Sequence, residues 1–334
     1  MPEPRPSGNV RRWTSLYLLL CGGLFLGFTY SSSTFAENVA DPALLGVYRS
    51  TNKDVSDQAV LGIKQFVNRA KEEAAQWTCI KTLEPLAAQN HDPVLHLLIG
   101  FAAAERNLHK LARGHLEEAL KGLGERYPNY PELHFAARYW LGRALLGQGH
   151  DKKAEEVLCE AVEIAERQTG LQQACLFWPG KTFCGAFGKS MVARLLFDFQ
   201  REESALGYYL GIDGAIAESS CYRPGGYYPL DLARCYAALM KHEEALGCFE
   251  KALLLTHWNS CDRQMLHMDA GWQALALEDW DAAISHARNA LSIQPYCRSA
   301  LVISGRARIG KGEFESAARD LWTAHHLDDE HPDV

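Results

Sequence analysis

The chain has 334 residues, enough for one large domain or two ordinary ones with a sizeable buried core. Its composition, 47% hydrophobic and 22% charged, is that of a folded globular protein and excludes a disordered or collagen-like chain. The formal net charge of -7 argues against a nucleic-acid partner, because neutralising phosphates requires clustered Lys and Arg in excess.

The first 36 residues carry the pattern of an export signal. Arg5, Arg11 and Arg12 precede an apolar stretch within residues 13–30, and small residues lead up to Ala36, where a signal peptidase would cut. The apolar stretch is long enough for an uncleaved anchor, which would attach the chain to a membrane. We therefore expect residues 1–36 to be a signal peptide or signal anchor and the rest to be periplasmic, secreted or membrane-anchored.

Residues 37–92 are predicted to form a linker and capping helices. Between Val55 and Gln89, Ala, Leu, Ile and Phe recur at helical intervals. A helical array needs such a cap, because its first repeat would otherwise leave an apolar face in water.

A recurring pattern of small residues governs the rest of the chain. A small residue is followed by Ala 12 and 19 positions later, and one such set recurs after 34 residues: Gly271, Ala283 and Ala290, then Gly305, Ala317 and Ala324. The frame can also be placed further upstream, in clear or weaker form. We call its six small residues the small positions: Gly100, Gly142, Ala193, Ala233, Gly271 and Gly305. One helix pair of this kind cannot cover its own apolar face, so the pattern predicts stacked pairs.

This spacing resembles the tetratricopeptide repeat (TPR) family over about residues 93–330. The resemblance implies an all-α fold, an alpha-alpha superhelix in which about six antiparallel helix pairs form a TPR-like solenoid. Successive small positions are up to 51 residues apart in the middle of the chain, so the array is expected to contain irregular insertions at about 170–190 and 219–229.

The residue after each small position is the candidate contact for a partner. It is Arg in four units and aromatic in two: Arg143, Arg194, Arg234 and Arg306, with Phe101 and Trp272. In the TPR family this position lies on the concave face that binds extended peptides, and guanidinium groups there could bind carboxylates or carbonyls. The alternative is that the arginines are solvated or pair with Asp and Glu of neighbouring repeats. The family's Lys and Asn clamp for chaperone carboxyl termini is not matched.

Cysteine spacing gives one candidate disulfide and no metal site. Cys175 and Cys184 bracket a short loop containing Pro179 and Gly180, although buried, unpaired cysteines are the alternative. The sequence contains no Cys-x2-Cys pair, no His-Glu-x-x-His and no Gly-x-Ser-x-Gly, so neither a cofactor nor a metal is predicted.

The sequence thus predicts a non-enzymatic, exported or membrane-anchored protein. We expect it to bind protein or peptide segments through its concave face and to mediate protein–protein interaction or complex assembly. One alternative is an enzyme or cofactor-binding protein with a site in the irregular 175–228 region. Another is a structural subunit of a membrane complex that keeps its leader as an anchor.

Overall fold

The structure is a computed structural model, and it describes residues 77, 80–81, 83–85, 87–88, 92–168, 183–212, 227–255 and 258–329. The leader predicted in residues 1–36, including the membrane attachment predicted through residues 13–30, lies outside them. No described helix combines the length and the apolar composition needed to cross a membrane.

From Pro93 onward the described residues form six helix pairs. In chain order they are α5 (Pro93–Glu105) with α6 (His109–Arg126), α7 (Pro131–Leu146) with α8 (Asp151–Glu166), α9 (Gly185–Asp198) with α10 (Glu202–Leu210), α12 (Tyr227–Ala238) with α13 (His242–Leu253), α14 (Ser260–Ala276) with α15 (Trp280–Ile293), and α16 (Arg298–Gly310) with α17 (Phe314–Asp329). Each pair packs together and against the next pair. The described part of the chain contains no strand, and the predicted all-α superhelix is confirmed.

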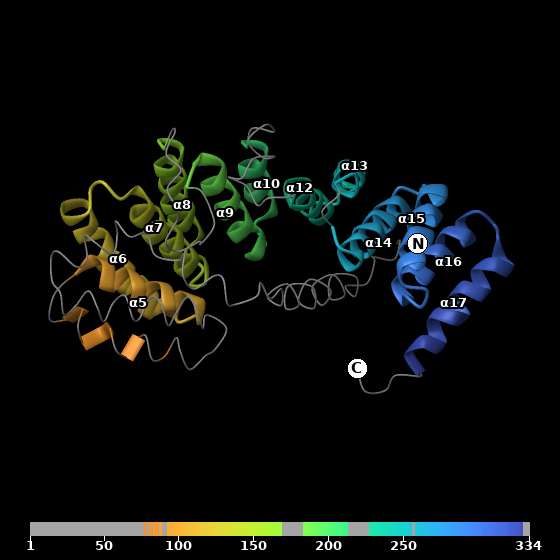
Figure 1. Cartoon of the computed structure of the whole chain (residues 1–334), viewed down its shortest axis with the longest axis horizontal. Helices are drawn as coiled ribbons and strands as arrows, with labels where there is room; N and C mark the ends of the chain where they lie inside the picture. Colours follow the sequence, from red (N-terminus) through yellow and green to blue (C-terminus); the bar gives the residue numbers. More distant parts are fainter. Residues whose placement is uncertain are drawn as a thin grey trace, which may run out of the picture.

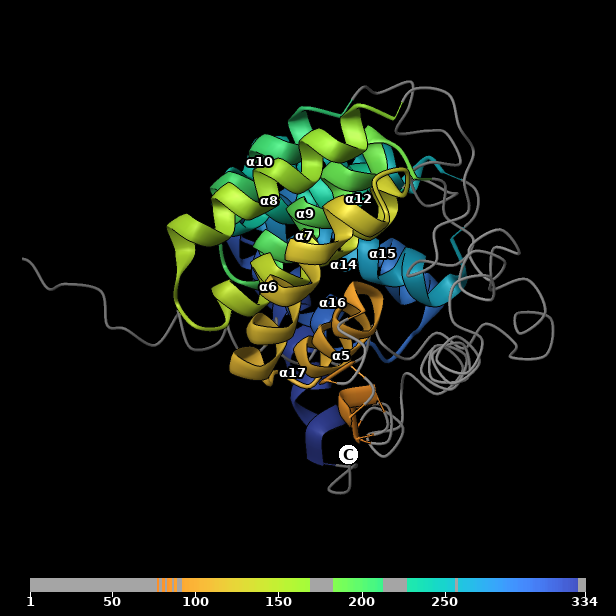
Figure 2. The ribbon, with the colours of Figure 1, turned by 90° about the vertical axis from the view of Figure 1, so that its left-hand side faces the viewer.

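The pairs follow one another along the long axis of the molecule, from α5 to α17 (Figure 1). The view along this axis shows α8 and α10 on the outside, with α9 and α7 further in (Figure 2). First helices of successive pairs also contact one another: α5 with α7, α7 with α9, and α14 with α16. We call the side on which these first helices line up the first-helix side.

The small positions allow the two helices of a pair to approach closely. A Cβ added at Gly142 would lie 2.5 Å from Leu158 Cγ on the second helix, and one added at Gly100 would lie 2.5 Å from Leu116 Cγ. Only a glycine fits such contacts without displacing the leucine. The recurring glycines of the sequence are therefore packing positions.

A second repeated feature lies in the turn between the two helices. The residue seven positions after each small position has a positive φ, from 57° to 78°: Asn107, Gly149, Gln200, Met240, Glu278 and Gly312. The next N–H then donates to a carbonyl of the first helix, as from His150 to Leu145 at 2.9 Å. This is a left-handed helix end, which satisfies carbonyls that the finished helix would leave unpaired.

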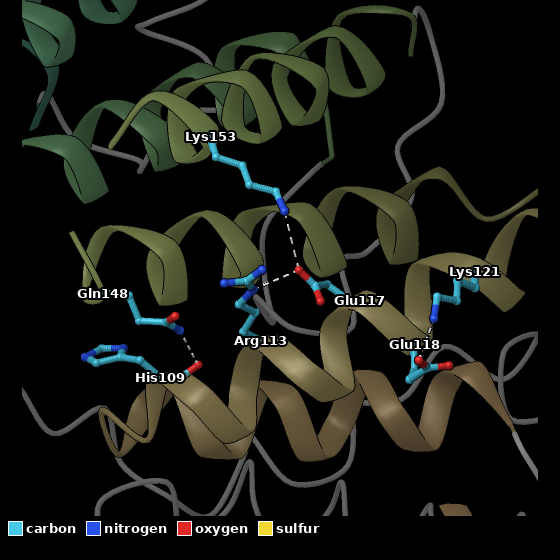
Figure 3. Close-up of polar contacts among 7 residues, drawn as sticks. All are labelled: His109, Arg113, Glu117, Glu118, Lys121, Gln148 and Lys153. Atoms are coloured by element: carbon cyan, nitrogen blue, oxygen red, sulfur yellow. Dashed lines mark hydrogen bonds and ion pairs between the residues drawn. The ribbon is translucent and has the colours of Figure 1, made fainter. Parts of the chain in front are cut away.

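Polar contacts join the first pair to the second (Figure 3). Gln148 Nε2 donates to the backbone oxygen of His109 at 2.9 Å, and Lys153 lies 3.6 Å from Glu117. The His109 ring also fills the space beside Gly147, where an added Cβ would clash with it. Packing and charge together set how the second pair stacks on the first.

The first predicted insertion, at about 170–190, ends earlier than expected. Helix α9 begins at Gly185, so its first turns replace the end of the predicted irregular segment. The reason is tertiary: the ring centroids of Phe183 and Phe187 lie 5.3 and 6.0 Å from that of Phe135 on α7. The spacing of the small positions predicts an insertion, whereas burial of the aromatic rings favours a helix from Gly185 onward.

The second predicted insertion, at about 219–229, is also shorter at its end. Helix α12 begins at Tyr227, and Tyr228 Oη donates to the backbone oxygen of Tyr209 at 3.0 Å. Pro229 falls in the first turn of α12, where a missing N–H leaves no helical bond unmade.

Candidate partner-binding face

The six predicted contact residues lie on the first helices of the six pairs, one residue after each small position. Five of them are partly buried, whereas Arg306 is exposed. Their surroundings differ along the array, and these surroundings determine what each can bind.

Arg143 is engaged within the chain. Its Nη1 donates to Glu105 Oε1 at 2.6 Å, which joins α7 to α5, and its guanidinium lies 5.3 Å from the centre of the Trp140 ring. Burial raises the pKa of Glu105 above its ordinary value, while the charge of Arg143 opposes the rise. The Trp140 ring in turn packs 4.7 Å from Phe101, the contact residue of the first pair.

Arg194 is flanked by two carboxylates. Burial alone would lower its pKa, but Asp231 of α12 and Asp198 of α9 raise the pKa above its ordinary value. Burial likewise raises the pKa of Asp198, which the charges of Arg194 and Arg143 counteract. These charges act on one another across three successive pairs.

Arg234 extends the series to the fifth pair. Burial raises the pKa of Asp269 on α14 to about 6, and the charge of Arg234 opposes this shift. The acids and arginines thus form one alternating series along the first-helix side, which we call the charge ladder: Glu105, Arg143, Asp198, Arg194, Asp231, Arg234 and Asp269.

The sequence predicted the ladder's arginines and missed its acids. Glu105 and Asp198 lie five residues after a small position, whereas Asp231 and Asp269 lie two residues before one. Both places are about one helical turn from the arginine position, so each acid falls on the arginine's face of the helix. This spacing from the arginine position is the sequence signal that could have identified the acids.

Trp272 and Arg306 form the end of the series beyond Asp269. The Arg306 guanidinium lies 5.6 Å from the centre of the Trp272 ring, a cation–π contact between α16 and α14. Arg306 forms no ion pair with any residue that the structure describes. Its fork of donors therefore remains accessible beside a flat aromatic surface.

Only part of the other candidate sites lies within the described residues. Cys175 lies outside them, so the predicted disulfide with Cys184 stays a prediction. Residues 169–182 and 213–226 also lie outside them, so only residues 183–212 and 227–228 of the 175–228 region considered for an enzyme site are described. The described residues contain no group of three or more His, Cys, Asp or Glu side chains that could hold a metal ion.

Comparisons with known proteins support the repeat architecture. Residues 135–168 match the model of the tetratricopeptide repeat, and this segment contains Gly142 and Arg143. No curated protein matches the chain.

Among solved structures, the C-terminal part of a TPR repeat-containing protein from Cytophaga hutchinsonii is 14% identical, with a TM-score of 0.51 over 73% of this chain and 88% of that one. The apo form of RapI is also 14% identical, with a TM-score of 0.50 over 80% of this chain and 94% of that one. BtubC from P. vanneervenii is 19% identical over 70% of this chain and 93% of that one, with a TM-score of 0.48.

These likenesses concern the fold. The periodic small positions, the six helix pairs and the family match at residues 135–168 agree with one another. The described residues form an all-α superhelix of antiparallel helix pairs, and residues 135–168 within it are similar to the tetratricopeptide repeat.

Proposed function

We propose that this protein is a binding scaffold whose first-helix side holds an extended segment of a partner protein. TPR-like helical arrays are typical of protein–protein interaction scaffolds, and the fold supports the proposal by analogy. The observation that carries it is the contact of Trp272 with Arg306, because Arg306 is exposed and forms no ion pair with a described residue, whereas Arg143 donates to Glu105.

The ladder limits the chemistry of the partner. Arg143 already donates to Glu105, so a partner carboxylate at that point would have to displace an internal ion pair. Arg306 has no such competitor among the described residues, and Trp272 offers a flat apolar surface beside it. We therefore propose that the partner places a carboxylate or a backbone carbonyl against Arg306 and an apolar side chain against Trp272.

A random peptide library displayed on phage tests this proposal with the immobilised chain as bait. We expect the selected peptides to lose at least about tenfold in affinity for Arg306→Ala and Trp272→Ala, because each change removes an anchor of the contact. Arg288→Ala is the matched control, since Arg288 is an exposed arginine on the second helix α15. Selected peptides that bind all three variants as tightly as the unchanged chain would refute the proposed site.

We also propose that the protein acts outside the cytoplasm, either exported or anchored through residues 13–30. The basic, apolar and small residues before Ala36 support this. Mass spectrometry of the protein from its native source tests it: an N-terminus after Ala36 indicates cleavage, whereas an intact leader in the membrane fraction indicates an anchor. An intact leader in the cytosolic fraction would contradict both.

A further inference from the structure

Two pairs of histidine rings occupy the same place in different helix pairs. His96 of α5 and His115 of α6 bring their Nδ1 atoms within 2.9 Å, and His267 of α14 and His286 of α15 bring theirs within 3.1 Å. In both cases the first histidine lies four residues before the small position and the second lies 15 residues after it. The other four units do not have His at either of these places. The coincidence in both geometry and position indicates a specific arrangement.

A contact of two imidazole nitrogens at this distance requires one N–H and one lone pair. The outer Nε2 of the second histidine decides which ring donates. His115 Nε2 lies 4.0 Å from Glu84 Oε1, and His286 Nε2 lies 4.0 Å from Glu250 Oε1. A carboxylate favours N–H over a lone pair, so we expect the second histidine to carry its proton at Nε2 and to accept at Nδ1. His96 and His267 are then the donors.

In the first histidine pair, two carboxylates partly offset a positive charge on His115. The charged groups acting on His115 are His96, Glu84 and Glu118, while α7 presents Trp140 to the Phe101 ring of α5. His115 is 15% exposed, so water screens a charge on it only partly.

The fifth pair has similar surroundings. Glu250 of α13 and Asp279, the N-cap of α15, act on His286, and Arg263 acts on His267. Helix α16, which packs against both α14 and α15, brings Ile303 to Gly271. His286 is 12% exposed.

We propose that the two histidine pairs are proton-sensitive joints. Each histidine pair holds its two helices together as long as it carries no more than one added proton, because a single imidazolium can still donate to a neutral ring. A second proton turns both Nδ1 atoms into donors and brings two positive charges together. Acidification therefore loosens the first and fifth helix pairs together.

The directions of the pKa shifts support this account. Burial lowers the pKa of His115 and of His286 below the ordinary value. Burial, with the charges of His286 and Arg263, lowers the pKa of His267 to about 4. A folded-state pKa below the unfolded value of 6.5 means that the unfolded chain binds more protons. His267 therefore costs stability as the pH falls from about 6.5 towards 4, and His115 and His286 act in the same direction.

Urea unfolding of the full chain at pH 7 and pH 5, with a chelator present, tests the proposal. His267 alone is expected to raise the unfolding equilibrium constant by up to about 20-fold over this interval. The double variant His96→Gln/His267→Gln keeps an N–H donor in each pair and lacks the titrating donor ring, so its change with pH should be smaller by about that factor. His150→Gln, at an exposed histidine before α8, is the control and should follow the unchanged chain.

Asp269 does not confound this comparison. Its pKa is raised, so its contribution to stability is lost as the pH rises through about 6, which is the opposite direction. It is present in every variant, and the difference between variants removes its effect.

Nitrogen NMR of the unchanged chain is the second readout, and it does not depend on a variant that folds. His96 and His267 should show the Nδ1–H form at pH 7.5, and His115 and His286 the Nε2–H form. The proposal is overturned if all four rings titrate independently near pH 6.5, or if the double variant has the same pH dependence as the unchanged chain.

A consequence for binding follows from the position of α14, which carries both His267 and Trp272. Acidification would also weaken the partner contact, and this last step alone rests on the proposed function. The unfolding and NMR measurements stand apart from it.

Discussion

Three of the four predicted contact arginines, Arg143, Arg194 and Arg234, lie near carboxylates of their own chain. An arginine on the first-helix side is therefore not by itself evidence of a contact with a partner. The repeat pattern predicts the arginines because they recur at one position. It does not predict the acids, because these occupy two positions and neither is filled in every unit. Of the two alternatives raised by the sequence, intramolecular pairing describes Arg143, which donates to Glu105. Asp231 and Asp198 also act on the charge of Arg194. For Arg306, which lies beside Trp272, binding of a partner remains the proposal.

The Arg143–Glu105 pair can be tested by removing one partner. Arg143→Ala leaves the Glu105 carboxylate partly buried without its donor, and we expect it to lower the free energy of unfolding by about 2 kcal/mol. Lys121→Ala is the control, because the Lys121–Glu118 pair is exposed and screened by water, so its loss should leave the free energy of unfolding nearly unchanged. Urea unfolding at pH 7 measures both. Equal effects of the two changes would show that the ladder pair is an ordinary surface contact.

The helix pair is the element that repeats, and its two invariant features are a close approach and a left-handed turn. The sequence predicts the first, because Gly and Ala recur in a fixed frame. The second is visible in the sequence only at Gly149 and Gly312; at Met240 and Glu278 the same backbone conformation is imposed by the helices that the turn connects. The start of α9 could not be predicted for a related reason, since the packing of Phe187 on Phe135 is a contact between residues far apart in the chain.

The packing role of the small positions predicts opposite effects for two glycine substitutions. Gly142→Ala should destabilise by about 1–3 kcal/mol, because the new Cβ would lie 2.5 Å from Leu158 on the facing helix. Gly114→Ala in α6 meets no atom within 4 Å, so it should stabilise by about 0.5–1 kcal/mol through helix propensity. Thermal unfolding of both variants measures the difference. Stabilisation by both changes would contradict the close approach of α7 and α8.

The whole molecule is an array in which each helix pair contacts its neighbours. The all-α superhelix follows from the sequence, because each unit presents an apolar stripe that only another unit can cover. The ladder could not be derived in the same way, since it depends on how neighbouring first helices are oriented. The leader and the Cys175–Cys184 disulfide lie outside the described residues and stay predictions.

Hydrogen–deuterium exchange of the chain, with and without a selected peptide, tests the central claim most directly. The account predicts added protection of backbone amides in the first helices, greatest in α14 and α16, which carry Trp272 and Arg306. The second helices α6, α8 and α10 should be unchanged. Protection concentrated on those second helices, with α14 and α16 unaffected, would contradict it.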